Sequence, residues 1–174
     1  LEGRFYDMEK SREIDLGTED VKELNGPLSF NHVGYCYAGC SNYAIRDINF
    51  TINENKMTAI VGPSGSGKST LIDLIPLLRV ATEGTITISG VDITRYKLKS
   101  IRMLISYVPQ SPQIFNGTIK DHITYGKADA TEAEVLEAIR LSGLESFISY
   151  LPYGLDTVVG EDAVSLSGGQ RQRL

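Results

Sequence analysis

The residues whose types and spacing most clearly indicate chemistry lie at positions 62–70, with the sequence Gly-Pro-Ser-Gly-Ser-Gly-Lys-Ser-Thr. The spacing is glycine, four residues, glycine, lysine and serine. Glycines allow consecutive backbone N–H groups to turn inward around a phosphate, at the positive end of the helix that follows. The pattern therefore predicts a site for a nucleotide triphosphate, formed by Gly62, Ser64, Gly65, Ser66, Gly67, Lys68, Ser69 and Thr70.

Two side chains of this stretch suit a triphosphate and its metal ion. Lys68 would reach the outer phosphates as a mobile positive charge, and the Ser69 hydroxyl is placed to coordinate Mg²⁺. A flexible loop of glycine and serine without a ligand is the alternative. The flanking residues favour the phosphate site, because the apolar run 57–61 predicts a buried strand leading in. The packed face of a helix leading out is predicted by Leu71, Ile72, Leu74 and Ile75.

Composition limits the classes of protein to consider. A chain of 174 residues with 41% hydrophobic residues is long enough for one ordinary domain. The net charge of −5 argues against broad binding of nucleic acid or of an anionic membrane. Cys36 and Cys40 lack the companion ligands of a zinc site, so we expect free thiols in a reducing compartment. The first residue is Leu1 and not methionine, which hints at a piece of a longer polypeptide.

Short apolar segments predict several strands. Residues 28–32, 48–52 and 85–89 alternate apolar and polar side chains, as half-buried strands do. The run 103–108, stopped by a proline, predicts another core strand. Ahead of these segments, residues 1–26 are polar and charged, and we expect a linker with a short helix there.

From about residue 117 the apolar period becomes helical. Thr131 and Glu134 fit a capping box, in which each side chain satisfies a free backbone N–H of the other residue. The helix that follows is expected to bury Val135, Leu136 and Ile139. A second helix is expected to bury Leu144, Phe147, Ile148 and Leu151.

A second motif, Leu166-Ser167-Gly168-Gly169-Gln170, lies near the end of the chain. Together with the glycine-rich stretch, it resembles the signature sequence of ABC-transporter ATPase domains. Tyr107-Val108-Pro109-Gln110 resembles the Q-loop of this family. Two further segments, 115–119 and 159–161, are similar to segments typical of the exporter branch. The resemblance covers roughly residues 27–174.

The resemblance implies an α/β fold of the P-loop NTPase type, with a RecA-like core and an N-terminal antiparallel β-subdomain. A helical subdomain is expected as an insertion at about 117–165. The ABC ATPase domain would occupy 27–174 and be incomplete, with the C-terminal part of the core missing. Residues 1–26 would then link it to an upstream transmembrane domain.

The resemblance also assigns roles to single residues, with ATP and Mg²⁺ as cofactors. Tyr37 would stack on adenine, although a tyrosine on a strand is often only a packing residue. Lys68 and Gln110 would act in catalysis, and Ser69 and Gln110 would bind Mg²⁺. Ser167, Gly168, Gly169 and Gln170 would complete the ATP site of a second ABC ATPase domain, so that two domains sandwich two nucleotides head to tail. The Ser167 hydroxyl is also expected to cap the helix that it opens.

One departure from the family pattern concerns hydrolysis. The second magnesium-binding carboxylate, the glutamate that would polarise the attacking water and the later histidine switch would all follow Leu174, the last residue of the chain. Because phosphoryl transfer depends mostly on positioning and charge stabilisation, we expect ATP binding without turnover from these residues alone.

The leading hypothesis is the ATP-binding domain of an ABC exporter, an ATPase that works on the cytoplasmic face of a membrane as part of an integral membrane protein. Its partners would be a second ABC ATPase domain and a transmembrane domain, without nucleic acid. The alternative is a soluble ABC ATPase of DNA repair or translation. A third hypothesis is a module that binds ATP without hydrolysis to regulate assembly.

Overall fold

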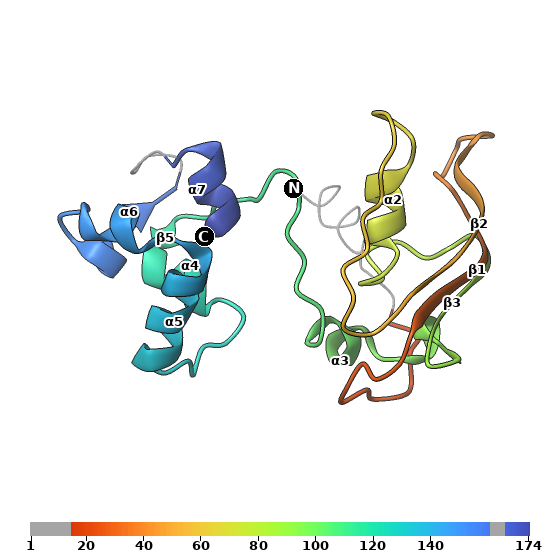
Figure 1. Cartoon of the computed structure of the whole chain (residues 1–174), viewed down its shortest axis with the longest axis horizontal. Coiled ribbons are helices and arrows are strands. Elements are labelled where there is room, and N and C mark those ends of the chain that lie inside the picture. Colours follow the sequence, from red (N-terminus) through yellow and green to blue (C-terminus); the bar gives the residue numbers. More distant parts are fainter. Residues whose placement is uncertain (1–14, 161–165) are drawn as a thin grey trace, which may run out of the picture. The chain divides into compact units, whose positions relative to one another are not determined.

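The computed structural model describes residues 15–160 and 166–174. The chain divides into two compact units, Leu1–Tyr107 and Val108–Leu174 (Figure 1). The first unit contains a four-stranded sheet and the glycine-rich loop. The second consists mainly of short helices.

The sheet of the first unit is antiparallel throughout, with the strand order β2-β1-β3-β4. Phe30 on the central strand β1 is buried and stacks on Phe50 of β2, with ring centroids 4.5 Å apart. The observed strands confirm the three predicted strands at 28–32, 48–52 and 85–89, although the third ends at Ile88. The strands are β1 (Leu28–Cys36), β2 (Tyr43–Ile52), β3 (Glu83–Ile88) and β4 (Val91–Asp92).

Three short helical elements accompany the sheet, and α2 begins directly after the glycine-rich loop. Helix α2 ends at Asp73, earlier than the apolar pattern predicts, because Pro76 lacks an N–H and disfavours helical backbone at the residue before it. Leu71 and Leu74 are nevertheless buried in the core, as predicted. The elements are α2 (Lys68–Asp73), η1 (Ile93–Arg95) and α3 (Leu98–Arg102).

Two predictions of strands are wrong. Residues 57–61 form no strand, and Met57 and Val61 are 100% and 89% exposed. Residues 103–108 are also irregular, with Met103 and Val108 mostly exposed. Both runs have the composition of strands buried on two faces, but such strands need neighbours on each side. The described residues provide no strand that pairs with either run.

The described part of the expected linker, residues 15–26, belongs to the first unit and contains no helix. The backbone of Glu19 forms an isolated parallel β-bridge with Tyr96, and the Val21 amide donates to Ser100 Oγ at 2.8 Å. Val21 and Leu24 pack against the apolar core. The remainder of that segment, residues 1–14, lies outside the described residues, and so does residue 161 of the exporter-like segment.

The second unit has its own core, in which Ile119, Val135, Ile139, Leu144, Ile148, Val159 and Leu166 are buried. Two short strands pair antiparallel in this unit: β5 directly precedes α4, and β6 follows η2. The elements are β5 (Gly117–Thr118), α4 (Ile119–Thr124), α5 (Glu132–Ser142), α6 (Glu145–Ser149), η2 (Gly154–Asp156), β6 (Val158–Val159) and α7 (Gly168–Arg173). Within 15–160 and 166–174, no helix is long and apolar enough to cross a bilayer.

The capping box of α5 forms as predicted. The Glu134 amide donates to Thr131 Oγ1 at 3.3 Å, and the Thr131 amide donates to Glu134 Oε2 at 2.9 Å. The predicted buried stripe is wrong at one position, because Leu136 is 54% exposed while Val135 and Ile139 are buried. On a helix, residues 135 and 139 share one face and residue 136 is turned about 100° away.

We expect the acid stability of the second unit to depend on Glu134. The Lys127 ammonium, followed by the Thr131 donors, lowers the pKa of Glu134 from 4.5 to about 2. A carboxylate with a lower pKa in the folded state stabilises it above the unfolded pKa, and this stabilisation is lost as pH falls from about 4.5 to about 2. NMR titration of the Glu134 carboxyl carbon measures the pKa directly.

Denaturant unfolding over the same pH range gives the second measurement. Glu134→Gln should flatten the pH dependence between about 4.5 and 2. Glu132→Gln is the matched control, because Glu132 lies in the same helical turn without the contacts to Lys127 and Thr131. A Glu134 carboxyl that titrates near its ordinary pKa would contradict the prediction.

Candidate functional site

The glycine-rich loop between residue 61 and α2 has the backbone that its sequence predicts. Gly65 and Gly67 have φ values of 80° and 86°, in the left-handed region that favours glycine. The Ser66 amide donates to the Pro63 carbonyl at 3.3 Å and closes the turn. A Cβ on Gly67 would lie 2.5 Å from Ala44 O and 2.5 Å from Ile45 Cγ2. The backbone of the loop therefore lies against β2 at Gly67, too close for a side chain.

The loop presents a row of backbone donors. The first helical hydrogen bond of α2 is donated by the Leu71 amide to the carbonyl of the N-cap residue Gly67, at 2.9 Å. The amides just before Leu71 have no acceptor among the residues that the structure describes, and no side chain caps the helix. These five free N–H groups are those of Gly65, Gly67, Lys68, Ser69 and Thr70.

Lys68 folds back over the loop. Its Nζ donates to the carbonyl oxygens of Gly62 at 3.0 Å and Pro63 at 2.7 Å, and it lies 3.5 Å from Ser66 Oγ. A positive charge thus stands at the loop beside the free amides. Because these partners are neutral and the ammonium is flexible, Lys68 can exchange them for an anionic oxygen.

Tyr37 lies beside this loop although it is 33 residues away from Thr70 in the sequence. Its hydroxyl is 3.0 Å from Thr70 Oγ1, and Thr70 is buried. Tyr35 packs edge-to-face against the Tyr37 ring, with centroids 5.1 Å apart and planes at 84°. The Tyr37 side chain remains partly exposed, at 38%. The structure therefore brings the predicted base-stacking residue and the predicted phosphate loop together.

Two residues around Tyr37 were missed by sequence reasoning. The Arg79 guanidinium carbon lies 4.7 Å from the centroid of the Tyr37 ring, and Arg79 Nε is 3.3 Å from Asp73 Oδ2. A signal for them exists, because Asp73 and Arg79 are charged residues within the apolar run 71–81. A charge in such a run is expected to have a specific partner.

The other predicted site residues belong to the second unit. Gln110 is exposed, and its carbonyl accepts a hydrogen bond from Gln172 Nε2 at 3.3 Å. Because Ser69 and Gln110 lie in different units, their joint binding of Mg²⁺ stays a prediction.

The signature motif places its residues at the start of α7. Ser167 Oγ accepts from the Gln170 amide at 3.2 Å, and Gln170 Oε1 accepts from the Ser167 amide at 2.8 Å. This capping box confirms the predicted role of Ser167 as a helix cap. Gly168 and Gly169 are exposed, and a Cβ on either would meet no atom within 4 Å. Contacts within the described residues therefore give no reason for glycine at these positions.

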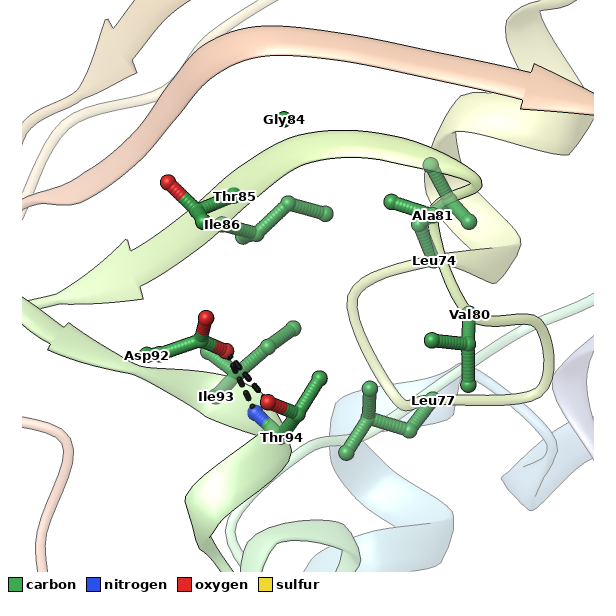
Figure 2. Close-up of a pocket in the computed structure, with 10 residues that line it drawn as sticks. All are labelled: Leu74, Leu77, Val80, Ala81, Gly84, Thr85, Ile86, Asp92, Ile93 and Thr94. Atoms are coloured by element: carbon green, nitrogen blue, oxygen red, sulfur yellow. Dashed lines mark hydrogen bonds between the residues drawn. The ribbon is translucent and has the colours of Figure 1, made fainter.

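A small apolar cavity lies between the segment that follows α2, the strand β3 and η1 (Figure 2). Thr94 closes one side of it, donating through its amide and hydroxyl to Asp92 Oδ1 at 2.8 and 2.7 Å. At about 40 Å³ the cavity is far too small for a nucleotide, and no residue of the loop 62–70 lines it. It is a packing gap of the core, separate from the site.

The donors of the loop fit a triphosphate with Mg²⁺. Free amides, an ammonium and the space at Gly65, where a Cβ would meet no atom within 4 Å, suit phosphate oxygens. The described residues contain no group of three His, Cys, Asp or Glu side chains that could hold a metal. Mg²⁺ is usually held through few protein ligands and the substrate's own phosphates, and the exposed Ser69 hydroxyl would be the protein ligand here.

The loop, the helix that it opens and the free amides define the class of a P-loop nucleotide-binding domain. More specifically, the chain belongs to the ABC transporter family, whose family model matches residues 45–174. The chain is 42% identical over 157 residues to the uncharacterized ABC transporter ATP-binding protein YwjA of Bacillus subtilis (strain 168), covering 90% of this chain and 27% of that protein.

Two other relatives are described as a flippase and as an ABC transporter. The identity is 40% over 174 residues to an ATP-dependent lipid A-core flippase of Pseudomonas fluorescens (strain Pf0-1), covering 99% of this chain and 29% of that protein. It is 43% over 161 residues to ABC transporter B family member 19 of Arabidopsis thaliana, covering 92% and 13%.

A solved structure of a bacterial Atm1-family ABC exporter with ATP bound matches with a TM-score of 0.88 and 32% identity, over 99% of this chain and 30% of that one. The resemblance to the ATP-binding domain of the exporter branch and the predicted P-loop fold are therefore confirmed. The chain spans less than a third of the length of each of these proteins.

We expect alanine to be tolerated less well at Gly67 than at Gly65. Both positions have left-handed backbone, so either substitution costs about 1 kcal/mol or more in strain. Only in Gly67→Ala would the new methyl group also collide with Ala44 and Ile45 of β2, and this collision adds about 1–3 kcal/mol to the loss of stability. Urea unfolding of the two variants, compared with the unsubstituted protein, measures the difference. Equal destabilisation by both would show that Gly67 is not packed against β2.

Proposed function

We propose that this chain is the ATP-binding domain of an ABC exporter and that it binds Mg-ATP at residues 62–70. One observation carries the proposal above the others. The five amides without an acceptor from Gly65 to Thr70 stand beside the Lys68 ammonium, and this arrangement is complementary to a chain of phosphates. The relatives described as ATP-dependent and the exporter solved with ATP bound support it.

Each residue of the site then has a defined task. The loop amides hold the inner phosphates, Lys68 moves from its carbonyl partners to the outer phosphates, and the Ser69 hydroxyl binds Mg²⁺. When bound, Mg²⁺ neutralises phosphate charge. Tyr37 stacks on the adenine ring, and its hydroxyl bond to Thr70 keeps the base site at a constant distance from the phosphate site.

The second unit would serve a partner domain. We propose that Ser167, Gly168, Gly169 and Gln170 contact the nucleotide of a second ABC ATPase domain. The support is that these residues are partly or fully exposed, and that both glycines leave open space where a side chain would stand. Gln110 would couple Mg-ATP to a transmembrane domain of the same protein, on the cytoplasmic face of a membrane. Hydrolysis would need a glutamate supplied by residues other than these 174.

Lys68→Ala should weaken the binding of Mg-ATP by about tenfold or more, because it removes a charge-assisted bond to phosphate. Isothermal titration calorimetry on the full-length protein measures the affinity. Lys56→Ala is the matched control, because Lys56 precedes the same loop, is exposed and contributes nothing to the row of phosphate donors. Unchanged affinity in Lys68→Ala would overturn the assignment of the phosphate loop.

Two variants of Ser167 separate helix capping from partner binding. Aspartate caps a helix as well as serine does, so Ser167→Asp should keep the stability of α7, whereas Ser167→Ala should lose about 1 kcal/mol. A carboxylate would repel a partner's phosphates, so Ser167→Asp should abolish dimerisation in Mg-ATP. Sedimentation velocity measures the dimer, and Thr131→Asp makes the same change at the cap of α5 as a control. Normal dimerisation of Ser167→Asp would rule out this role.

A further inference from the structure

Arg79 contacts both tyrosines at the end of β1. Its guanidinium carbon lies 4.7 Å from the centroid of the Tyr37 ring and 5.8 Å from that of Tyr35. Arg79 Nη1 also donates to the Tyr35 hydroxyl at 3.3 Å. A cation over an aromatic face at these distances is attracted by the electron density of the ring. Arg79 therefore covers one face of the Tyr37 ring.

The position of Arg79 is itself set by a second layer of contacts. Its Nε is 3.3 Å from Asp73 Oδ2, and the other oxygen of Asp73 accepts from the Tyr107 hydroxyl at 2.8 Å. Asp73 is the last residue of α2, and the side chain of Arg79 is only 36% exposed. The hydrogen bond to Tyr35, and after it the bond to Asp73, raise the pKa of Arg79, so the guanidinium keeps its charge.

Tyr37 is consequently held by three different groups. Arg79 lies over its face, Tyr35 packs edge-to-face against it, and Thr70 is bonded to its hydroxyl. With one face covered by a cation, a planar base can stack only on the opposite face. A ring fixed in this way loses little conformational entropy when a base stacks on it, which improves affinity through preorganisation.

We infer that Arg79 is a positioning residue for the nucleotide base, which fixes the Tyr37 ring for stacking and is itself held by Asp73. The inference rests on the proposed function, and it deepens it by assigning recognition of the base to this group of residues. Recognition of the phosphates depends on Lys68 and the loop amides, which Arg79 does not contact. The two contributions to affinity are therefore separable.

The test compares two ligands, Mg-ATP and Mg-tripolyphosphate, by calorimetry on the full-length protein. Tripolyphosphate has the phosphates without the base. Arg79→Met keeps the bulk of the side chain and removes its charge, and it should weaken Mg-ATP about five- to twentyfold. It should change Mg-tripolyphosphate less than about twofold, because the loop is untouched.

Two further variants and one control make the result specific. Arg79→Lys keeps the charge without the planar fork and should recover part of the affinity for ATP. Asp73→Asn should weaken ATP in the same selective way, because it loosens Arg79. Arg46→Met is the matched control. The Arg46 guanidinium carbon lies 5.4 Å from the centroid of the Tyr43 ring, so this substitution removes a similar cation–aromatic contact that does not involve Tyr37.

A double-mutant cycle shows whether Arg79 acts through Tyr37. In a Tyr37→Ala background, Arg79→Met should cause no further loss of ATP affinity. An equal loss for both ligands would reduce Arg79 to a structural residue, and unchanged ATP affinity in Arg79→Met would overturn the inference while the phosphate site stands. If the unsubstituted protein binds neither ligand in a manner that depends on Lys68, the proposed function falls and the inference falls with it.

Discussion

The close approach of Gly67 to β2 is the contact on which the rest of the first unit depends. There is no room for a side chain between the loop and the Ala44 carbonyl, so the sheet sets where α2 begins. The start of α2 in turn sets the direction of its free amides. A buried sheet contact thus becomes a constraint on where phosphate oxygens can be held.

The same strand pair also positions the aromatic side of the site. Tyr37 follows β1 directly, and the Thr70 hydroxyl ties it to the first turn of α2. The sheet and the helix therefore hold the tyrosine from two directions. Since Thr70 is buried, its hydroxyl needs this partner, and losing it would leave a buried polar group unpaired.

The features that the sequence could predict are local. The glycine-rich loop and the caps at Thr131 and Ser167 follow from spacings of three to six residues, and the structure contains them. The strand predicted at 57–61 fails because burial depends on neighbouring strands, which an apolar run does not reveal. The support of Tyr37 by Arg79 joins residues 42 positions apart, and such contacts follow from the fold and not from a spacing.

The open glycines at the start of α7 have a consequence for genetics. A Cβ at Gly168 or Gly169 would meet no atom of the described residues within 4 Å, so we expect an alanine variant there to fold and to bind its own nucleotide normally. On the proposed function, the damage would appear in the site of the neighbouring domain. Such an allele would be dominant, because the variant subunit would inactivate the dimers that it forms with an unsubstituted subunit. An allele that unfolds the domain would only lower the amount of protein.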